Sequence, residues 1–422
     1  MVVTMSQLER RLAALPPCPR VVVSGNAATP WEVLETLDRA VPAYRLWMLN
    51  AGNGVPDRPG VVAETPFVGP GMRGHSALEY VPCRLSMAPL LFSRTQPPDA
   101  VIVHCAPPRQ GVLSLGIEVN VLPAAIEACR ARGGLVVVVV NRHMPYTLGD
   151  AQLDAAAADV IIEVDAPLPT AGAPARPDEA SVAVAEHVAA LVPDGATVQM
   201  GIGAVPDAVA GHLRDRQDLS VWSEMFSDGL LTLLRGGALS DRMPITASFC
   251  FGTQELYDYV DGNPRVRMLR TEKTNDPARI AANPLMCSIN TALEVDLYGQ
   301  VNASRIDGRI FSGYGGQTDF IVGALHSPGG QALIALRSWH PRADVSTIVP
   351  LLGEPVTSFQ PSAVVTEQGM ARLFGRSTAG QAEDLIDRAA HPSVREELWE
   401  EARSLGLCGA RRSGRDSVVV SC

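Results

Sequence analysis

Short apolar runs alternate with segments of helical spacing along the first part of the chain. The runs are rich in valine, which is typical of strands that are buried on both faces of a parallel sheet. They are Val21–Val23, Arg45–Leu49, Asp99–Cys105, Leu135–Val140 and Val160–Val164. One helical pattern opens near Thr29 and Pro30, and another covers Pro123–Ala131. This alternation predicts βαβ units that form a parallel sheet.

The composition changes between Asp165 and Asp178, where Pro, Ala, Gly and Thr dominate and a linker is expected. The alternation of strands and helices then restarts. Helices are predicted over Glu179–Leu191 and Pro206–Leu213, and a last pair of helices from about Ala379 to Leu405. Strands are predicted over Thr197–Met200, Leu219–Trp222, Ile245–Phe249, Val266–Leu269, Ala332–Leu336 and Ala363–Val365. The pattern therefore predicts two similar open-sheet α/β domains, residues 1–178 and 179–422, with the active site in the cleft between them.

The composition is that of an ordinary globular protein. Hydrophobic residues make up 46% of the 422 positions and charged residues 19%. The net charge is −10 and Lys273 is the only lysine, which argues against nucleic-acid and anionic-membrane partners. The eight cysteines are scattered without a C-x-x-C pair, no signal peptide is evident, and Leu135–Val140 is too short to span a bilayer. A cytoplasmic location is expected.

A lone glutamate follows one of the predicted strands. The apolar run Leu219–Trp222 stops just before Glu224, and a second apolar run, Leu230–Leu234, follows a polar turn. This order predicts a strand, Glu224 at its carboxyl end, and then a helix. Ligands of open α/β sheets gather at the carboxyl ends of strands, so Glu224 is a candidate catalytic residue. The alternative is a solvated loop residue or a charge at a helix start.

Two glycine-rich segments could bring backbone amides close to a ligand. Gly201–Pro206 follows the predicted strand Thr197–Met200 and opens a helix, whose free N–H groups suit an anion or an oxyanion. A dinucleotide fingerprint with Glu224 as its acid is the rival interpretation, but Pro206 replaces the third glycine. Phe311–Phe320 contains three glycines in four positions between two phenylalanines, and its alternative is a surface loop.

Several other chemistries lack their motifs. No glycine is followed by lysine, which excludes a Walker A loop, and there is no G-x-S-x-G nucleophile elbow. The eight histidines show no metal-ligand spacing, so no metal site is expected.

A set of longer motifs resembles a known family. The sequence is similar to the class I coenzyme A transferases, in particular to their acetyl-CoA hydrolase / 4-hydroxybutyrate CoA-transferase branch. The likeness runs from Val21 to Leu398. The matching motifs are GIGAVPDAV (201–209), SEMFSDG (223–229), TNDPARIAANP (274–284), SINTALEVDLYGQV (288–301), SGYGGQTDF (312–320), IVPLL (348–352), VVTEQGMARLFGRS (364–377) and HPSVREEL (391–398).

The resemblance implies a ping-pong transferase in which Glu224 is the nucleophile and forms a glutamyl-CoA thioester. Its partners would be an acyl-CoA and a small carboxylate, with coenzyme A as co-substrate and no permanently bound cofactor. A homodimer is considered. The resemblance places Asn275 at the substrate. It places the following residues at the CoA and oxyanion sites: Gly201, Ile202, Gly203, Ala204, Val205, Ala292, Ser312, Gly315 and Gly316.

Two alternatives remain open at the level of sequence: an acyl-CoA hydrolase with the same glutamate, and a relative that is non-catalytic or uses a carrier-bound thioester. Three single residues depart from the family pattern, and Trp339-His340 stands where small residues are usual in the family. Asp344 replaces a lysine, and Val322 and Thr347 replace arginines. A carboxylate at position 344 would repel the CoA phosphates, so weaker binding of free CoA esters is expected. The acid that is used is not determined by the sequence.

Overall fold

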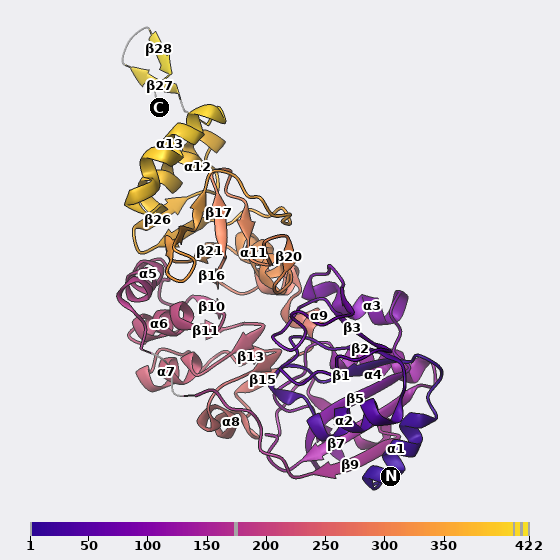
Figure 1. The fold of residues 1–422 in the computed structure, drawn as a ribbon. Coiled ribbons are helices and arrows are strands. Elements are labelled where there is room, and N and C mark those ends of the chain that lie inside the picture. Colours follow the sequence, from indigo (N-terminus) through magenta and orange to yellow (C-terminus); the bar gives the residue numbers. More distant parts are fainter. Residues whose placement is uncertain (1, 173–175, 408–409, 414–416, 421–422) are drawn as a thin grey trace.

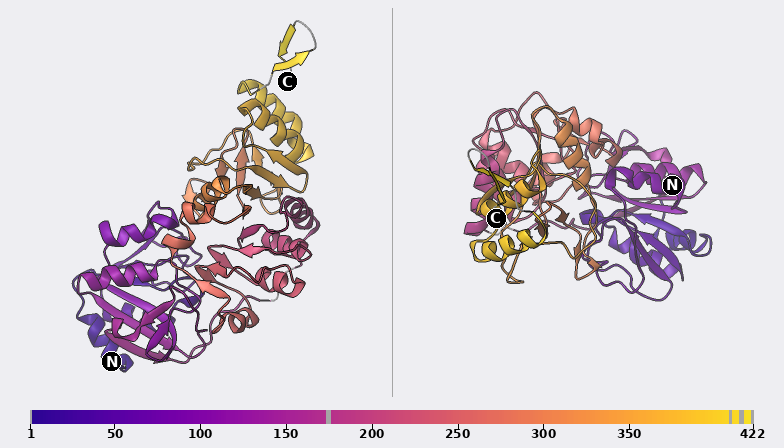
Figure 2. Two further views of the ribbon diagram at one scale, coloured as in Figure 1. Left: turned by 180° about the vertical axis from the view of Figure 1, so that it is seen from behind. Right: turned by 90° about the horizontal axis from the view of Figure 1, so that it is seen from above.

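The computed structural model describes residues 2–172, 176–407, 410–413 and 417–420 of the chain. It contains two large open sheets with helices packed on both faces (Figure 1). Helix α1 (Met5–Ala13) and helix α13 (Arg395–Ser404) lie at opposite ends of the molecule (Figure 2). The predicted α/β class with open sheets is confirmed. The division at residue 178 stays a prediction.

The first sheet has nine strands and is centred on β1 (Arg20–Val23). From β1 it runs in parallel through β2 (Tyr44–Trp47) and β3 (Val61–Thr65) to β4 (Leu78–Tyr80). On the other side it runs in parallel through β5 (Ala100–Arg109) and β7 (Leu135–Asn141) to β9 (Val160–Val164). The end of β5 also carries an antiparallel branch of β6 (Val112–Ser114) and β8 (Gln152–Asp154).

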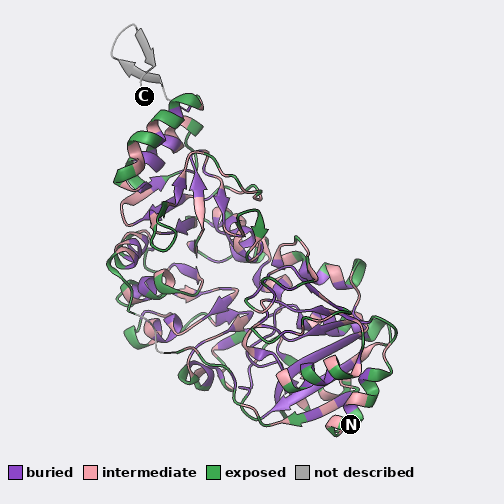
Figure 3. Cartoon of the chain, in the orientation of Figure 1, coloured by how far each residue is buried: buried purple, intermediate pink, exposed green. Residues whose placement is uncertain are grey.

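Alternating valines explain why these strands are hydrophobic throughout. Val21 and Val23 pack with α1 and α2 (Trp31–Ala40) on one face of the sheet. Val22 packs on the other face, in the core that also holds residues of α3 (Ala88–Arg94) and α4 (Leu122–Ala131). Figure 3 shows buried residues along the strands and exposed ones on the outer faces of the helices. Both faces are therefore covered, as the valine runs predict.

The second sheet has six strands in the order β11-β10-β16-β21-β25-β26, and all of them are parallel except β26. Helix α5 contributes Val184 and Val188 to the core on one face, and α11 contributes Phe320 and Ile321 to the core on the other. The strands are β10 (Thr197–Met200), β11 (Ser220–Val221), β16 (Met286–Asn290), β21 (Gln331–Ala335), β25 (Ala363–Thr366) and β26 (Gly369–Arg372). The helices are α5 (Glu179–Ala190), α6 (Ala204–Leu213), α7 (Gly229–Gly236), α10 (Pro277–Ala281), α11 (Gln317–His326) and α12 (Thr378–Asp384).

Shorter elements complete the described chain. Small strand groups are β12 (Met225–Phe226) with β14 (Phe249–Cys250), β13 (Ile245–Ala247) with β15 (Val266–Met268), β17 (Glu294–Asp296) with β18 (Val301–Asn302) and β24 (Ile348–Val349), β19 (Arg305–Ile306) with β20 (Arg309–Ile310), β22 (Trp339–His340) with β23 (Val345–Ser346), and β27 (Ala410–Ser413) with β28 (Ser417–Val420). The remaining helices are α8 (Gln254–Val260) and α9 (Thr271–Thr274). Single turns are 3-10 at η1 (Asn26–Ala28), η2 (Leu85–Met87), η3 (Ala155–Ala157) and η5 (Pro392–Val394), and π-helical at η4 (Leu385–Ala389).

Two local predictions need correction. The segment after Glu224 is not directly helical, because Met225 and Phe226 form β12 and pair with Phe249 and Cys250 before α7 begins. The segment 311–320 is a loop only in its first half, since α11 begins at Gln317. In the described part of the chain, no helix combines the length and the apolar character needed to cross a membrane.

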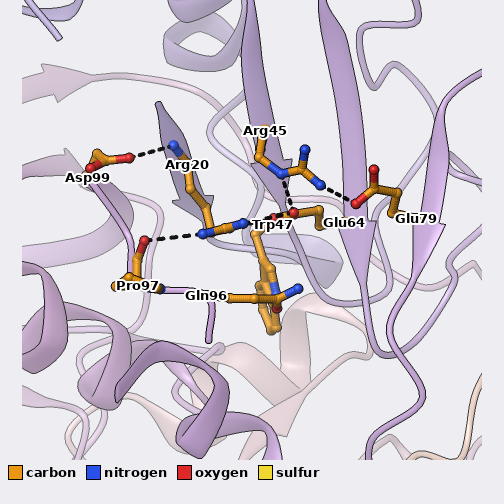
Figure 4. A network of polar contacts seen from close by, with 8 residues as sticks. All are labelled: Arg20, Arg45, Trp47, Glu64, Glu79, Gln96, Pro97 and Asp99. Carbon is orange, nitrogen blue, oxygen red and sulfur yellow. Dashed lines mark hydrogen bonds and ion pairs between the residues drawn. The ribbon is translucent and has the colours of Figure 1, made fainter. Parts of the chain in front are cut away.

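A buried carboxylate joins four neighbouring strands of the first sheet (Figure 4). Glu64 of β3 is fully buried and accepts hydrogen bonds from Arg20 of β1, at 2.6 Å from Nε and 3.1 Å from Nη2. Arg45 of β2 pairs with Glu64 as well and extends to Glu79 of β4. Because Glu64 pairs with two partly buried guanidinium groups and Glu79 supplies the second negative charge, this network links the four strands with its charges balanced.

Glu64→Gln is expected to lower the free energy of unfolding by about 2–3 kcal/mol, because it leaves Arg20 and Arg45 without their buried anion. Urea unfolding at neutral pH measures this loss. Glu79→Gln is the matched control. Its side chain is 53% exposed, so a change of about 0–1 kcal/mol is expected. Equal losses in the two variants would contradict the structural role of the buried pair.

Candidate active site

The backbone around Glu224 is held between two neighbouring segments. Its carbonyl oxygen accepts hydrogen bonds from the N–H groups of Ser248 at 2.7 Å and Phe249 at 3.1 Å, and Ser223 N donates to Thr246 O at 3.0 Å. The residue lies between β11 and β12, so it leaves the sheet at the carboxyl end of a parallel strand. These backbone hydrogen bonds therefore fix the position from which the half-buried side chain of Glu224 extends.

A buried asparagine orients the Glu224 carboxylate. Asn275 follows α9, and its Nδ2 donates to Glu224 Oε2 at 2.7 Å. The hydroxyl of Thr274 donates to Asn275 Oδ1 at 2.8 Å, and Trp222 Nε1 donates to Thr274 O at 2.9 Å. Because an ionised carboxylate only accepts hydrogen bonds, the N–H end of Asn275 faces Glu224, and its amide oxygen is left to accept from Thr274.

A glycine packs directly against this pair. A Cβ atom at Gly316 would lie 1.9 Å from Glu224 Oε2 and 2.3 Å from Asn275 Nδ2, so no larger residue fits. Gly316 is the N-cap of α11. Among the described residues, no acceptor pairs with the backbone N–H groups of Gly315 and Gly316. The carboxylate therefore lies beside a helix N-terminus with free donors, a place that favours negative charge.

Burial makes two carboxyl groups of this site weaker acids than ordinary carboxyl groups. It raises the pKa of Glu224 to about 7; the Asn275 hydrogen bond opposes the shift and the charge of Asp319 adds to it. Burial likewise raises the pKa of Asp319 to about 6. The carboxylate of Asp319 accepts from Ser86 N at 3.1 Å and Ser86 Oγ at 2.8 Å. Perturbed carboxyl groups in a cavity are a mark of catalytic sites.

Glu224 lines a cavity of about 350 Å³. One wall comes from loops of the first sheet and the other from segments of residues 199–320. The lining residues are Asn26, Leu49, Asn50, Phe67, Leu85, Asn120, Gln199, Met200, Gly201, Ile202, Pro206, Glu224, Met225, Phe249, Thr271, Ile289, Asn290, Thr291, Ala303, Ser312, Gly313, Tyr314, Gly315, Gly316, Gln317 and Phe320. The cavity is large enough to admit a small ligand.

Comparison with known proteins assigns the family. Residues 252–402 match the acetyl-CoA hydrolase/transferase C-terminal domain. The chain is 38% identical to 4-hydroxybutyrate coenzyme A transferase of Clostridium kluyveri over 335 residues, which cover 76% of this chain and 77% of the relative. The chain belongs to the acetyl-CoA hydrolase/transferase family.

Two further relatives extend the likeness. Succinyl-CoA:acetate/propanoyl-CoA:succinate CoA transferase of Fasciola hepatica is 35% identical over 410 residues, 90% of this chain and 84% of that protein. The crystal structure of RipA from Yersinia pestis superposes with a TM-score of 0.89 at 28% identity and covers 96% of this chain and 98% of RipA. The expected family resemblance is therefore confirmed, and the fold is that of the acetyl-CoA hydrolase/transferase family.

Most of the site residues predicted from the family likeness come together. Glu224, Gly201, Ile202, Ser312, Gly315 and Gly316 line the cavity, and Asn275 binds Glu224 beside it. Gly203, Ala204 and Val205 instead lie at the start of α6, and Gly203 lines a second cavity together with Ile202. Ala292 packs against the apolar core of the second sheet. The roles assigned to all these residues stay predictions.

The asparagines of the opposite wall were not among the predicted site residues. Asn26 and Asn50 follow β1 and β2, at the carboxyl ends of parallel strands. The same rule that singled out Glu224 applies to these two positions and would have identified them.

The three departures from the family pattern lie away from the lining residues of this cavity. Asp344 accepts a hydrogen bond from Trp339 Nε1 at 2.9 Å in the β22–β23 turn. Thr347 Oγ1 donates to Arg337 O at 2.5 Å, and the carbonyl of Val322 contacts His326 Nδ1 at 2.8 Å. Weaker CoA binding through Asp344 remains a prediction, and the contact with Trp339 shows that its carboxylate already has a partner in the protein.

Gly316→Ala is expected to destabilise the protein by about 1–3 kcal/mol, because the new methyl group overlaps Glu224 and Asn275. Gly211→Ala is the matched control. Its Cβ would meet nothing within 4 Å in α6, so a gain of up to about 1 kcal/mol is expected there. Urea unfolding of the two variants measures both values, and a Gly316→Ala protein as stable as the wild type would refute the close packing.

Glu224→Gln is expected to stabilise the protein by about 1–3 kcal/mol at pH 8 and much less at pH 5. The pKa of Glu224 is about 7 in the folded protein against an ordinary 4.5. The folded state therefore holds the proton more tightly, and the wild type loses stability as the pH rises through this window, whereas glutamine does not titrate. Urea unfolding at both pH values measures the difference. The exposed Glu383 of α12 provides the control Glu383→Gln, and an effect of Glu224→Gln that is independent of pH would contradict the raised pKa.

Proposed function

We propose that the protein is a CoA-transferase that moves coenzyme A between an acyl-CoA and a small carboxylic acid, with Glu224 as the nucleophile. The single observation that carries the proposal is the Glu224 carboxylate itself. It lines a cavity, is oriented by Asn275, and lies against Gly316 at the start of α11. The relatives named as CoA transferases support the same class of reaction.

In the first half of the proposed reaction, a Glu224 carboxylate oxygen attacks the thioester carbonyl carbon. The C–S bond breaks, coenzyme A leaves as a thiolate, and an acyl-glutamyl anhydride forms. The thiolate then attacks the side-chain carbonyl carbon of Glu224 and releases the acyl group as a free carboxylate. A glutamyl-CoA thioester remains on the enzyme.

In the second half, an acceptor carboxylate attacks the glutamyl thioester and expels the CoA thiolate again. The thiolate attacks the acceptor carbonyl of the new anhydride, which forms the product acyl-CoA and restores the Glu224 carboxylate. Together these reaction steps transfer coenzyme A without net uptake or release of a proton. It needs Glu224 in its ionised form, which dominates above its pKa of about 7.

Two sets of N–H donors suit the oxyanions of these steps. The Asn275 amide already contacts Glu224 Oε2, where charge develops when the glutamyl carbonyl is attacked. The free N–H groups of Gly315 and Gly316 lie on the cavity wall, where the substrate carbonyl oxygen would be. One such donor typically contributes about 2.7–4 kcal/mol to transition-state stabilisation, which a weak carboxylate nucleophile requires.

Glu224→Gln is expected to lower transferase turnover by at least about three orders of magnitude, because an amide cannot act as the nucleophile. Activity with acetyl-CoA and a panel of short carboxylic acids measures the loss, and circular dichroism checks the fold. Glu383→Gln is the control and should retain wild-type turnover.

Borohydride added to the wild type in the presence of acyl-CoA should reduce a thioester in the peptide that holds Glu224, as detected by mass spectrometry. An unmodified peptide and near-wild-type turnover of Glu224→Gln would exclude the covalent route.

Hydrolysis is the second candidate function, because the name of the matching family includes acetyl-CoA hydrolase. In that case water attacks the glutamyl thioester in place of an acceptor carboxylate. Incorporation of an isotope-labelled carboxylate into acyl-CoA separates the two functions. Label in the acyl-CoA pool supports the transferase, whereas release of free coenzyme A without label supports the hydrolase.

A further inference from the structure

A second glutamate is buried behind the cavity wall opposite Glu224. Glu118 is 1% exposed and pairs in a β-bridge with Phe249. The N–H groups of Val119 and Asn120 donate to Ser248 O at 3.0 and 3.1 Å, while Ser248 N donates to Glu224 O at 2.7 Å. The segment 248–249 thus lies between the two glutamates, and two strand spacings, roughly 10 Å, separate their backbones.

Three asparagines stand between Glu118 and the cavity. Asn26 Nδ2 donates to both carboxylate oxygens of Glu118 at 2.8 Å, and Asn120 Nδ2 donates to one of them at 2.6 Å. Asn50 Nδ2 donates to Asn26 Oδ1 at 2.7 Å. All three asparagines line the cavity, and all have positive φ, at 45° for Asn26, 43° for Asn50 and 21° for Asn120. Asparagine tolerates this backbone region better than most residues, which suits it to these loops.

The hydrogen-bonded chain Asn50–Asn26–Glu118–Asn120, called the relay below, determines which side-chain atoms of this wall face the cavity. Every hydrogen-bond partner that the described residues provide for the Glu118 side chain is an N–H donor, as an ionised carboxylate requires. None of its described partners is an Arg, Lys or His. Donors of Asn26 and Asn120 point to Glu118, and a donor of Asn50 points to Asn26. The side chain of Asn50 therefore turns its carbonyl oxygen, an acceptor, away from the relay.

The electrostatics agree with this geometry. Burial raises the pKa of Glu118 to about 7, with a further contribution from the charge of Glu224, and the hydrogen bonds of Asn120 and Asn26 oppose the shift. At pH 8 a further carboxylate brought into the cavity would face the charge of Glu224 directly and the charge of Glu118 across the asparagine wall.

We propose that Glu118 is a specificity-determining residue that makes the acyl end of the cavity accept short uncharged acyl groups, preferably with a hydroxyl at the far end, and reject acyl groups with a second carboxylate. Glu118 acts through Asn26, Asn50 and Asn120, so it is a positioning residue. The inference rests on the proposed function, since it assumes that the acyl group is delivered to Glu224. The acyl preference that it gives this chain differs from the one in the name of the Fasciola hepatica relative, which includes succinyl-CoA.

Three CoA esters with four-carbon acyl groups test the proposal, because they differ only at the far end of the chain. Butyryl-CoA ends in a methyl group, 4-hydroxybutyryl-CoA in a hydroxyl, and succinyl-CoA in a carboxylate. The wild type at pH 8 is expected to use succinyl-CoA with a kcat/KM at least tenfold below those of the other two. Glu118→Gln should raise the ratio of succinyl-CoA to butyryl-CoA at least tenfold, whereas Glu118→Asp, which keeps the charge, should retain the wild-type order.

A purely structural role of Glu118 would lower kcat/KM for all three esters by the same factor and leave their ratios unchanged, which would overturn the proposal. Equal use of succinyl-CoA and butyryl-CoA by the wild type would overturn it as well. Asn50→Leu gives a second test if Glu118→Gln does not fold. It should reduce the preference for 4-hydroxybutyryl-CoA over butyryl-CoA about tenfold without admitting succinyl-CoA, and an unchanged preference counts against the relay.

The test of Glu118 can fail or succeed independently of the test of Glu224 as the nucleophile. Turnover that survives in Glu224→Gln refutes the nucleophile but leaves the ester ratios measurable. If no ester is turned over, calorimetric binding of the three esters to the wild type and Glu118→Gln replaces kcat/KM. Dissociation constants in the expected order then support the specificity inference, and equal constants refute it.

Discussion

The absence of space for a side chain at Gly316 is the constraint on which the site depends. Segments that contain residues 224, 275 and 316 meet there, and a single methyl group would overlap both Glu224 and Asn275. These segments leave the second sheet region at different points of the chain, so their meeting requires the sheet order and the helix packing to be correct. Close packing of this kind converts the fold into a fixed orientation of one carboxylate.

The same burial that orients Glu224 also destabilises its charged form. Its pKa is raised to about 7 and that of Asp319 to about 6, both mainly by burial. Asn275 and the α11 N-terminus offset part of this effect without supplying a full positive charge. Amide donors leave the carboxylate free to react, whereas an arginine paired with it would lower its nucleophilicity. A weakly stabilised anion in a small cavity is what the proposed chemistry requires.

Sequence patterns predicted the scaffold better than the cavity. The valine runs predicted β1, β5 and β7 because burial on both faces imposes the same residue type at every position. Glu224 was predicted because the strand-end rule is local. Asn26 and Asn50 satisfy the same strand-end rule, whereas Glu118 could not be predicted, because the hydrogen bonds that join it to these asparagines connect loops far apart in the chain. The two-residue β12 was missed for a similar reason: its partner, Phe249–Cys250, is distant in sequence.

The two walls of the cavity are built from different parts of the chain, and this separates reactivity from selectivity. Segments between residues 199 and 320 supply Glu224 and the donors around it, while the loops after β1, β2 and β6 supply the asparagine wall. Ser248 and Phe249 connect the walls through backbone hydrogen bonds and a β-bridge, which do not depend on side-chain groups. A change at the asparagine wall therefore alters the acyl group that fits while the carboxylate stays in place. In the proposed enzyme, such a division lets the acyl preference change without moving the nucleophile.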